Sequence, residues 1–312
     1  MLGRRLEKQT MEKRKLGKTG MAVTPLGYGS MGLRGPRTWG VRVVEEDAAD
    51  RFLNQVLDSG INFIDTSPDY GICEQRIGDY ISSRRSEYFL ATKCGCVYQE
   101  VDNQLQIVHV WDKEVVRRNL ETSLQRMKTD YVDVLQFHGG DAAALQQAGL
   151  IELLIDFKRQ GVIRNLGVST KIPNLKALID LQVFDTFQIP YSCLDRTHHE
   201  LISKAAAVGA GVIIRGGVAQ GGPDAVIQRQ ANNRIWELAK LSQLVPKEMT
   251  AAQLLLRYTL SHPDCHTVIV GTCDHGHLES NIQAVKAGPL EESLYAEMTR
   301  RVMQVESVGN GS

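Results

Sequence analysis

Four ionisable residues lie at or just after the ends of short apolar runs, where parallel strands would bring their side chains together. Asp65, Lys93 and His138 end three such runs, and Tyr70 follows Asp65 closely along the chain. A tyrosine with a pKa near 10 is a weak acid–base catalyst at neutral pH, but a neighbouring ammonium lowers that pKa. A buried carboxylate keeps the ammonium charged, and a neutral histidine can orient a substrate oxygen. The four side chains therefore predict a carbonyl-reducing site with Tyr70 as the proton donor.

Each of the four also has an ordinary structural explanation when it is taken alone. The alternatives are a loop-capping Asp65, a solvated strand end at Lys93, a turn aromatic at Tyr70 and a hydrogen-bonded core histidine at His138. Charged residues are seldom selected for packing. Ionisable residues at three successive strand ends therefore favour a joint chemical role.

The elements that must position these residues alternate between strands and helices. An apolar stripe at Ala48, Phe52 and Val56, stopped by Gly60, indicates one helix, and residues 150–160 indicate another. Strands that alternate with helices pair in parallel through right-handed crossovers. Eight such units predict a closed (β/α)8 TIM barrel of the α/β class, with its chemistry at the carboxyl ends of the strands. The predicted strands are 24–28, 62–65, 88–93, 132–138, 163–169, 185–189, 211–215 and 267–270.

Two further segments flank the predicted barrel. Residues 15–24 predict a β-hairpin around Lys18-Thr19-Gly20 ahead of the first barrel strand, and extra helices are expected at the C-terminal end. We expect residues 1–13 to be a disordered N-terminal segment, within which Met11 is an alternative start. Residues 14–312 are then expected to form a single barrel domain.

Composition excludes several classes of protein. The 312 residues carry 36 basic and 36 acidic side chains, so a general binder of nucleic acid or anionic membrane is not expected. No apolar run approaches the roughly 20 residues that a membrane-spanning helix needs. Six cysteines are too few for a disulfide scaffold of this length, which favours a reducing, cytoplasmic location.

Several motifs in order resemble the aldo-keto reductase family, and the similarity runs from about Arg14 to about Ala287. The resemblance implies a (β/α)8 barrel that uses a nicotinamide cofactor without a metal. It also implies a catalytic tetrad of Asp65, Tyr70, Lys93 and His138. The matching segments are Leu16-Gly17-Lys18-Thr19-Gly20, Gly60-Ile61-Asn62-Phe63-Ile64-Asp65-Thr66-Ser67, Tyr70-Gly71, Ala91-Thr92-Lys93 and Gln136-Phe137-His138.

The resemblance also assigns residues to the nicotinamide end of the cofactor. Ser169 and Gln188 match family positions that hold the carboxamide, whereas Thr170 stands in place of the usual Asn. Arg215 stands in place of an aromatic residue that stacks on the nicotinamide, and a planar guanidinium can also stack on a ring. The alternative for Arg215 is a salt bridge at the barrel mouth.

The segment after the last predicted strand bears on the choice between NADPH and NADH. Gly271, Thr272, His277 and Asn281 stand at its cofactor-binding positions. Asn281 matches the family residue, whereas Gly271 and His277 replace a Lys and an Arg, and Ser280 replaces an acidic residue. NADPH is the expectation from the resemblance, and NADH stays open because a permanent cation for the 2′-phosphate is lacking. Asp274 would repel that phosphate if it faced it, whereas a helix beginning near His277 would offer backbone N–H groups.

Other motifs have simpler explanations. The glycines of segment 27–32 match G-x-G-x-x-G only weakly, because a helix-breaking Gly35-Pro36 follows. Residues 262–266 and 275–277 contain possible metal ligands, but zinc needs three or four that converge, so no metal site is expected. Cys94-Gly95-Cys96 is likewise expected to pack a loop.

Residues 95–111 predict a polar specificity loop. Its Tyr98 and Trp111, with Trp39 from an earlier loop, either line a pocket or pack on the rim.

The sequence thus predicts an NAD(P)-dependent oxidoreductase that interconverts a small-molecule carbonyl (aldehyde, ketone or sugar) and an alcohol. Direction, substrate and oligomeric state stay open. One alternative is a cofactor-binding regulatory subunit of the same fold with weak activity. The other is a metal-dependent hydrolase barrel, which would need an early pair of metal-binding histidines that the sequence lacks.

Overall fold

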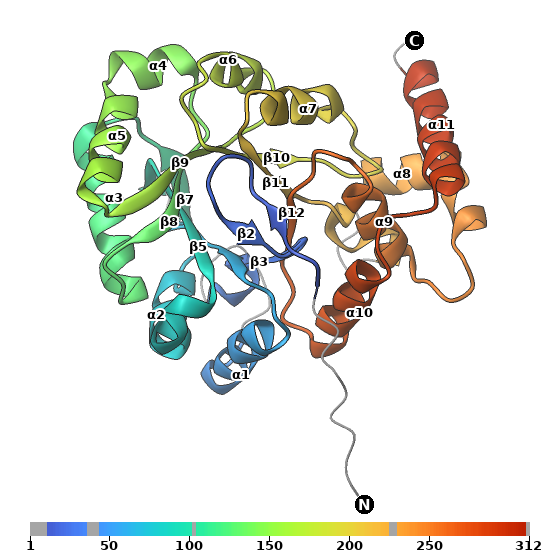
Figure 1. Cartoon of the computed structure of the whole chain (residues 1–312), viewed down its shortest axis with the longest axis horizontal. Coiled ribbons are helices and arrows are strands. Elements are labelled where there is room, and N and C mark those ends of the chain that lie inside the picture. Colours follow the sequence, from blue (N-terminus) through green and yellow to red (C-terminus); the bar gives the residue numbers. More distant parts are fainter. Residues whose placement is uncertain (1–10, 36–43, 102–103, 225–229, 310–312) are drawn as a thin grey trace, which may run out of the picture.

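The computed structural model describes residues 11–35, 44–101, 104–224 and 230–309. Within them, eight parallel strands close into a barrel in the order β10-β11-β12-β3-β4-β5-β8-β9 (Figure 1). The predicted (β/α)8 barrel is confirmed. The strands are β3 (Leu26–Gly29), β4 (Phe63–Asp65), β5 (Phe89–Cys94), β8 (Val132–His138), β9 (Ile163–Ser169), β10 (Thr186–Pro190), β11 (Gly211–Arg215) and β12 (Thr267–Val270).

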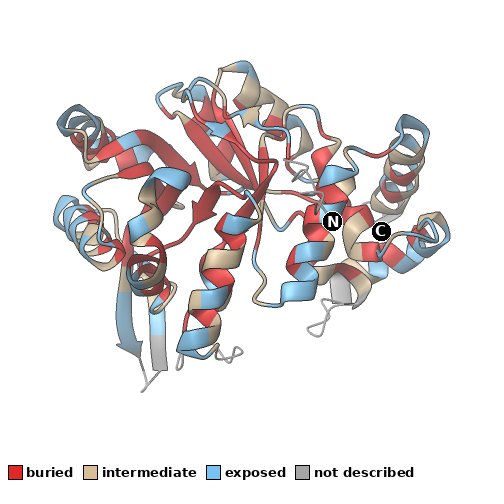
Figure 2. Cartoon of the chain, turned by 60° about the horizontal axis from the view of Figure 1, so that its bottom comes forward, coloured by how far each residue is buried: buried red, intermediate tan, exposed pale blue. Residues whose placement is uncertain are grey.

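Helices surround the strands and bury their apolar faces against them, as the red inner sides in Figure 2 show. The predicted helix near 150–160 is α5, which ends at Gly161 in the left-handed conformation that glycine favours. Helix α1 begins at Glu46, with Glu46 and Asp47 in its first turn. The helices are α1 (Glu46–Asp58), α2 (Cys73–Ile81), α3 (Lys113–Met127), α4 (Ala142–Gln147), α5 (Leu150–Gln160), α6 (Asn174–Asp180), α7 (His199–Ala207), α8 (Gln230–Leu238), α9 (Ala251–Leu260), α10 (His275–Lys286) and α11 (Glu292–Gly309).

The predicted N-terminal hairpin closes the amino-terminal end of the barrel. Strands β1 (Arg14–Lys15) and β2 (Ala22–Val23) pair antiparallel. The hairpin's buried Leu16, Met21 and Val23 form one apolar cluster with barrel side chains such as Phe63 and Val134. Figure 1 shows this hairpin across the barrel strands. The barrel is therefore plugged at the end opposite the predicted chemistry.

Gly17 lets this hairpin approach the barrel closely. Its φ is +52°, and a Cβ there would lie 2.4 Å from the backbone nitrogen of Gly211. Residues 1–10, part of the predicted disordered segment, lie outside the described residues. Met11 is buried and packs in the main core.

A second hairpin stands where the sequence predicted a polar loop over residues 95–111. Strands β6 (Cys96–Val101) and β7 (Gln104–His109) pair antiparallel. The exposed Tyr98, Gln99 and Glu100 explain why the segment looks polar in sequence. A strand of a two-stranded ribbon can face solvent on both sides. The β6 segment therefore lacks the run of buried apolar residues that marks a barrel strand in the sequence.

Short 3-10 turns complete the fold. One of them lies within the glycine-containing segment 27–32 and shows whether that segment can bind a phosphate. Residues Ser30–Leu33 form η1 directly after β3, instead of an α-helix that could receive a phosphate at its N-terminus. The motif's resemblance to a dinucleotide fingerprint is therefore accidental. The predicted extra C-terminal helix is α11, and none of the described helices is both long and apolar enough to span a bilayer.

Candidate active site

Parallel pairing brings the carboxyl ends of the barrel strands to one mouth. Asp65, His138, Ser169 and Arg215 are the last residues of β4, β8, β9 and β11. Lys93 is one residue from the end of β5 and pairs in register with Gln136 of β8. The polar residues that the sequence assigned to the site therefore occupy one rim.

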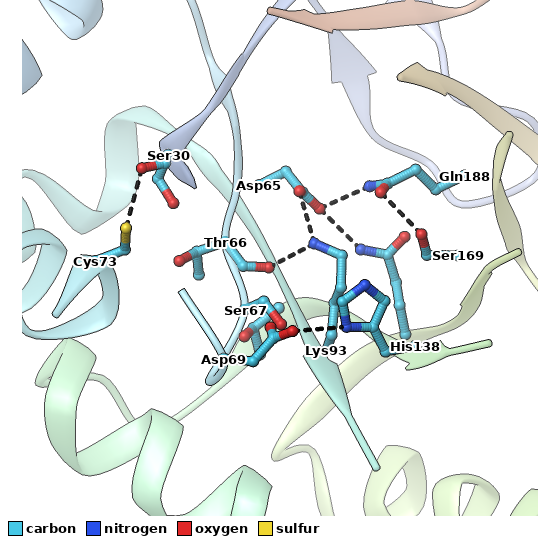
Figure 3. A network of polar contacts seen from close by, with 12 residues as sticks. Ser30, Asp65, Thr66, Ser67, Asp69, Cys73, Lys93, His138, Ser169 and Gln188 are labelled. Atoms are coloured by element: carbon cyan, nitrogen blue, oxygen red, sulfur yellow. Dashed lines mark hydrogen bonds and ion pairs between the residues drawn. The ribbon is translucent and has the colours of Figure 1, made fainter. Parts of the chain in front are cut away.

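Asp65 and Lys93 form a fully buried ion pair (Figure 3). Lys93 Nζ donates to Asp65 Oδ2 at 2.7 Å and to the backbone oxygen of Thr66 at 2.7 Å. The other carboxylate oxygen of Asp65 accepts from Gln136 Nε2 at 2.9 Å and from Gln188 Nε2 at 2.7 Å. Removing one partner from such a pair leaves an uncompensated buried charge and costs about 3–5 kcal/mol.

These contacts keep Lys93 protonated inside the barrel. Burial alone would lower the pKa of Lys93, but attraction to Asp65 and Tyr70 outweighs it, so the pKa is raised. The predicted partnership of Asp65 and Lys93 has the required geometry. A permanent ammonium therefore faces the neighbouring phenol.

Tyr70 lies beside this ammonium, with Lys93 Nζ 4.8 Å from the centre of its ring. Burial raises the pKa of Tyr70 above its usual value near 10, and attraction to Lys93 offsets only part of that rise. The sequence predicted a net lowering of this pKa. That prediction is wrong, because residue types and spacing carry no measure of how deeply the phenol is buried.

His138 is held on its Nδ1 side by groups that the sequence did not indicate. Asp69 Oδ2 lies 3.4 Å from His138 Nδ1, and Cys96 Sγ lies 3.3 Å from the same nitrogen. The ring of His109 meets the His138 ring edge-on at 4.7 Å. Tyr70 lies on another side, with its ring centre 6.4 Å from that of His138. His138 thus lies between the phenol and a second polar cluster.

Burial would raise the pKa of Asp69, but hydrogen bonding and attraction to His138 outweigh it and lower the pKa to about 2. Asp69 therefore carries its negative charge inside the rim at neutral pH. Its neighbour Ser67 contacts Cys96, with 3.8 Å between Oγ and Sγ. The loop after β4 and the start of β6 consequently form one wall beside His138.

Gln136, Asp69, Cys96 and His109 are the residues that sequence reasoning missed. Gln136 has a signal that could have found it, because it lies two residues before His138 on the same strand and therefore on the same face. The other three come from a loop and from both strands of the unforeseen hairpin, so only the fold brings them together.

Three predicted cofactor residues lie together at the ends of β9 and β10. Ser169 Oγ donates to Gln188 Oε1 at 3.0 Å, and the Thr170 backbone N–H donates to the Gln188 backbone oxygen at 3.2 Å. Their hydroxyl and amide groups match a carboxamide, which both donates and accepts hydrogen bonds. The donor set therefore fits the nicotinamide end of the predicted cofactor.

Arg215 ends β11, the strand that pairs with β10. Burial lowers the pKa of Arg215, while attraction to Tyr70 and Asp65 opposes that shift. Within the described residues no ion pair involves its side chain, so the alternative of a rim salt bridge gains no partner there. Its guanidinium is a partly buried cation attracted by Tyr70, Asp65 and Asp195.

The residues predicted to bind the adenosine side of the cofactor follow the end of β12. Helix α10 begins at His275, and Asp274 caps it by accepting from the His277 backbone N–H at 2.9 Å. Thr272 Oγ1 in turn accepts from the Asp274 backbone N–H at 3.1 Å. A carboxylate therefore already occupies the His277 N–H, while the expectation that this helix offers backbone N–H groups to an anion stays a prediction. Asn281 is buried one turn further along.

The aromatic residues predicted to line a pocket or pack on the rim separate into different roles. Trp111 packs on the rim, edge-on to Phe137 with 5.9 Å between ring centres, and stacks on His109. Tyr98 is exposed, and its hydroxyl accepts from the Gly71 backbone N–H beside Tyr70 at 3.1 Å. Trp39 lies outside the described residues.

The histidine-rich C-terminal segment does not form a ligand set among the described residues. His266 Nδ1 accepts from the Val212 backbone, and His262 Nδ1 accepts from the Asp264 backbone. The rings of His262 and His199 pack together with Tyr191. These histidines therefore serve packing and backbone hydrogen bonding.

Comparison with known proteins decides the family. The model of the aldo/keto reductase family matches residues 25–301. The chain belongs to this family. It is 29% identical to "Uncharacterized oxidoreductase YqkF" of Bacillus subtilis, with 90% of this chain and 94% of that protein covered. It is 28% identical to L-galactose dehydrogenase of Arabidopsis thaliana, with 88% of each covered.

A solved structure supports the same assignment. The holo form of aldo-keto reductase AKR11C1 from Bacillus halodurans superposes with a TM-score of 0.80 at 29% identity, covering 95% of this chain and 96% of that one. This aldo-keto reductase is therefore an NAD(P)-dependent oxidoreductase by family, and its eight-stranded barrel is the fold of its relatives.

Proposed function

We propose that this aldo-keto reductase interconverts a small-molecule carbonyl and its alcohol, with Tyr70 as general acid and base. The observation that carries the proposal is the buried Asp65–Lys93 pair, whose ammonium lies 4.8 Å from the Tyr70 ring centre. Packing alone does not require a fully buried ion pair beside a tyrosine at the open mouth of a barrel. The arrangement suits proton transfer to a substrate oxygen.

The bound nicotinamide would supply or accept the hydride. Ser169, Thr170, Gln188 and Arg215 would hold its ring at the mouth. Tyr70 would pass its phenol proton to the substrate oxygen, and the Lys93 ammonium would stabilise the phenolate that remains. His138 would orient that oxygen by a hydrogen bond. Asp65 would act as a positioning residue, because it fixes and keeps charged the ammonium of Lys93.

We also propose that NADH binds at least as tightly as NADPH, in contrast to the NADPH expected from the resemblance. Asp274 places a carboxylate at the N-cap of α10, and the first turn of the helix carries no Lys or Arg. A 2′-phosphate there would lose its strongest type of partner and meet a negative charge. A fluorescence titration with both cofactors in parallel measures the two affinities.

Tighter binding of NADPH by tenfold would overturn this cofactor preference. Binding of neither cofactor to the folded protein would overturn the oxidoreductase proposal as a whole. The cytoplasmic location expected from the cysteines stays a prediction.

The variant Tyr70→Phe tests the proposed function. Only the proton donor is lost, so carbonyl turnover should fall by at least about a hundredfold, while the Kd for the cofactor stays within about twofold. Turnover is measured with a panel of aldehydes, ketones and sugars, and cofactor affinity is measured by fluorescence titration.

Tyr131→Phe is the matched control, because Tyr131 directly precedes β8 at the end of the barrel opposite the tetrad, so its loss of a phenol hydroxyl should leave the rate unchanged. A Tyr70→Phe enzyme that keeps most of its rate would show that another group transfers the proton. Cofactor binding without turnover on any carbonyl in the wild-type chain would instead identify a regulatory subunit.

A further inference from the structure

Four side chains with metal-ligating atoms converge beside His138. Asp69, Cys96, His109 and His138 each offer one such atom, and these atoms all lie within 4.8 Å of one another. They come from the loop after β4, both ends of the β6–β7 hairpin and the end of β8. Carboxylate, thiolate and two imidazoles form a donor set that zinc accepts in proteins.

The distances are close to those of a tetrahedral site. Zinc bonds of about 2.0–2.3 Å place neighbouring ligand atoms roughly 3.3–3.8 Å apart. The His138 Nδ1 atom already lies 3.3 Å from Cys96 Sγ and 3.4 Å from Asp69 Oδ2. His109 ends β7, and its ligand atom lies within 4.8 Å of those of the other three residues.

A second observation points to a ligand at this place. Asp69 is 3% exposed, yet its Oδ1 has no hydrogen-bond partner among the described residues. A buried carboxylate oxygen without a partner carries a desolvation cost that a cation would relieve. Figure 3 shows the Asp69 carboxylate meeting His138 through Oδ2, and Oδ1 is the second oxygen of that carboxylate.

The scaffold holds the ligands in place before any ion arrives. Asn119 of α3 accepts from the Cys96 backbone N–H at 2.9 Å and donates to the Cys96 backbone oxygen at 3.0 Å. The Val110 backbone N–H donates to the Gly95 oxygen at 2.8 Å and closes the base of the hairpin. Trp111 stacks on the ring of His109. Such supporting contacts are typical of metal sites.

We propose that Asp69, Cys96, His109 and His138 form a binding site for a zinc-class divalent cation. The Cys96 thiol loses its proton to solvent when the metal–sulfur bond forms. A cation bound at His138 Nδ1 leaves Nε2 as the nitrogen that can meet a substrate oxygen. The site therefore couples metal occupancy to the orientation of a residue of the proposed tetrad. The sequence predicted no metal, since these ligands are scattered along the chain.

Titration of the purified chain with Zn²⁺ and with Co²⁺ tests the site without any measurement of turnover. We expect one cation per chain, and with Co²⁺ we expect a thiolate-to-cobalt charge-transfer band together with the visible bands of tetrahedral cobalt. Cys96→Ser should abolish the charge-transfer band, and His109→Asn should weaken Zn²⁺ binding by about tenfold or more.

Cys94→Ala is the matched control. Cys94 lies two residues before Cys96 but packs in the main core, so its loss should leave the cobalt spectrum unchanged. Because His109 is exposed, His109→Asn keeps the test valid even if Cys96→Ser fails to fold. Absence of saturable binding, or equal affinity in the wild type and His109→Asn, would overturn the proposal. These readouts do not depend on turnover, so they separate this site from the proposed reductase activity.

Discussion

Asp65 shows how a single residue organises the candidate site. Its carboxylate accepts one ammonium and two amide groups, from Lys93, Gln136 and Gln188, while fully buried. Sequence reasoning found the pairing with Lys93 because both residues end apolar runs. It could not find that Gln188, assigned to the cofactor, also donates to Asp65, because that contact joins strands that are distant in the chain.

The raised pKa of Tyr70 predicts the pH dependence of turnover. The neutral phenol is the proton donor for reduction, and burial raises its pKa above 10. With saturating cofactor, the reductive rate attributable to Tyr70 should therefore stay constant from about pH 6 to 9 and fall only in more alkaline solution. A fall centred near pH 7 in the kcat profile would contradict a phenol donor.

Arg215→Ala tests the role of the cation at the mouth. If its guanidinium covers the nicotinamide, its loss should raise the Kd for the cofactor by about tenfold, equivalent to about 1.4 kcal/mol. Fluorescence titration measures the change. Arg234→Ala, which removes a guanidinium from α8, is the control. An unchanged Kd in Arg215→Ala would exclude Arg215 from cofactor binding.

At the scale of elements, strands β8, β9, β11 and β12 have the predicted bounds, because most of their residues are buried and apolar residues dominate each run. The β6–β7 hairpin was missed, because its exposed polar residues hide the strand pattern. The dipeptide Asp102-Asn103 between two runs rich in β-branched residues is a turn signal that could have revealed it.

Gly95 should be essential to the placement of that hairpin. Its φ is +86°, and a Cβ would lie 2.4 Å from the Trp111 ring. Gly95→Ala should therefore lower the free energy of unfolding by about 2–3 kcal/mol, because overpacking adds to backbone strain. Chemical denaturation measures the loss.

Gly60→Ala separates these two effects. Gly60 has a φ of +88°, but no atom of its surroundings lies within 4 Å of the place that an added methyl group would take, so the substitution introduces backbone strain alone. We expect a smaller loss, of about 1 kcal/mol. Equal losses in the two variants would show that Trp111 does not pack against Gly95 as described.

At the scale of the whole molecule, the buried histidines link folding to pH. Burial, with repulsion from His199, lowers the pKa of His262 from 6.5 to about 4. The unfolded chain therefore binds a proton that the folded chain resists between those pH values. The stability contributed by neutral His262 is complete above about pH 6.5 and declines as the pH falls toward about 4.

His262→Asn should flatten this part of the stability profile. The wild type should lose stability faster than the variant between about pH 6.5 and 4, by at most about 1.4 kcal/mol per pH unit. Thermal unfolding across that range measures the difference. Parallel profiles for His262→Asn and the wild type would contradict the shifted pKa.

The barrel can close only late in the synthesis of the chain. Strand β3 completes its pairing only with β12, about 240 residues later in the chain. At roughly 5–20 residues per second, a ribosome needs on the order of 10–50 s to cover that distance. During this interval one edge of β3 has no barrel strand to pair with. Nascent chains halted before residue 267 should accordingly be far more sensitive to protease than the released protein.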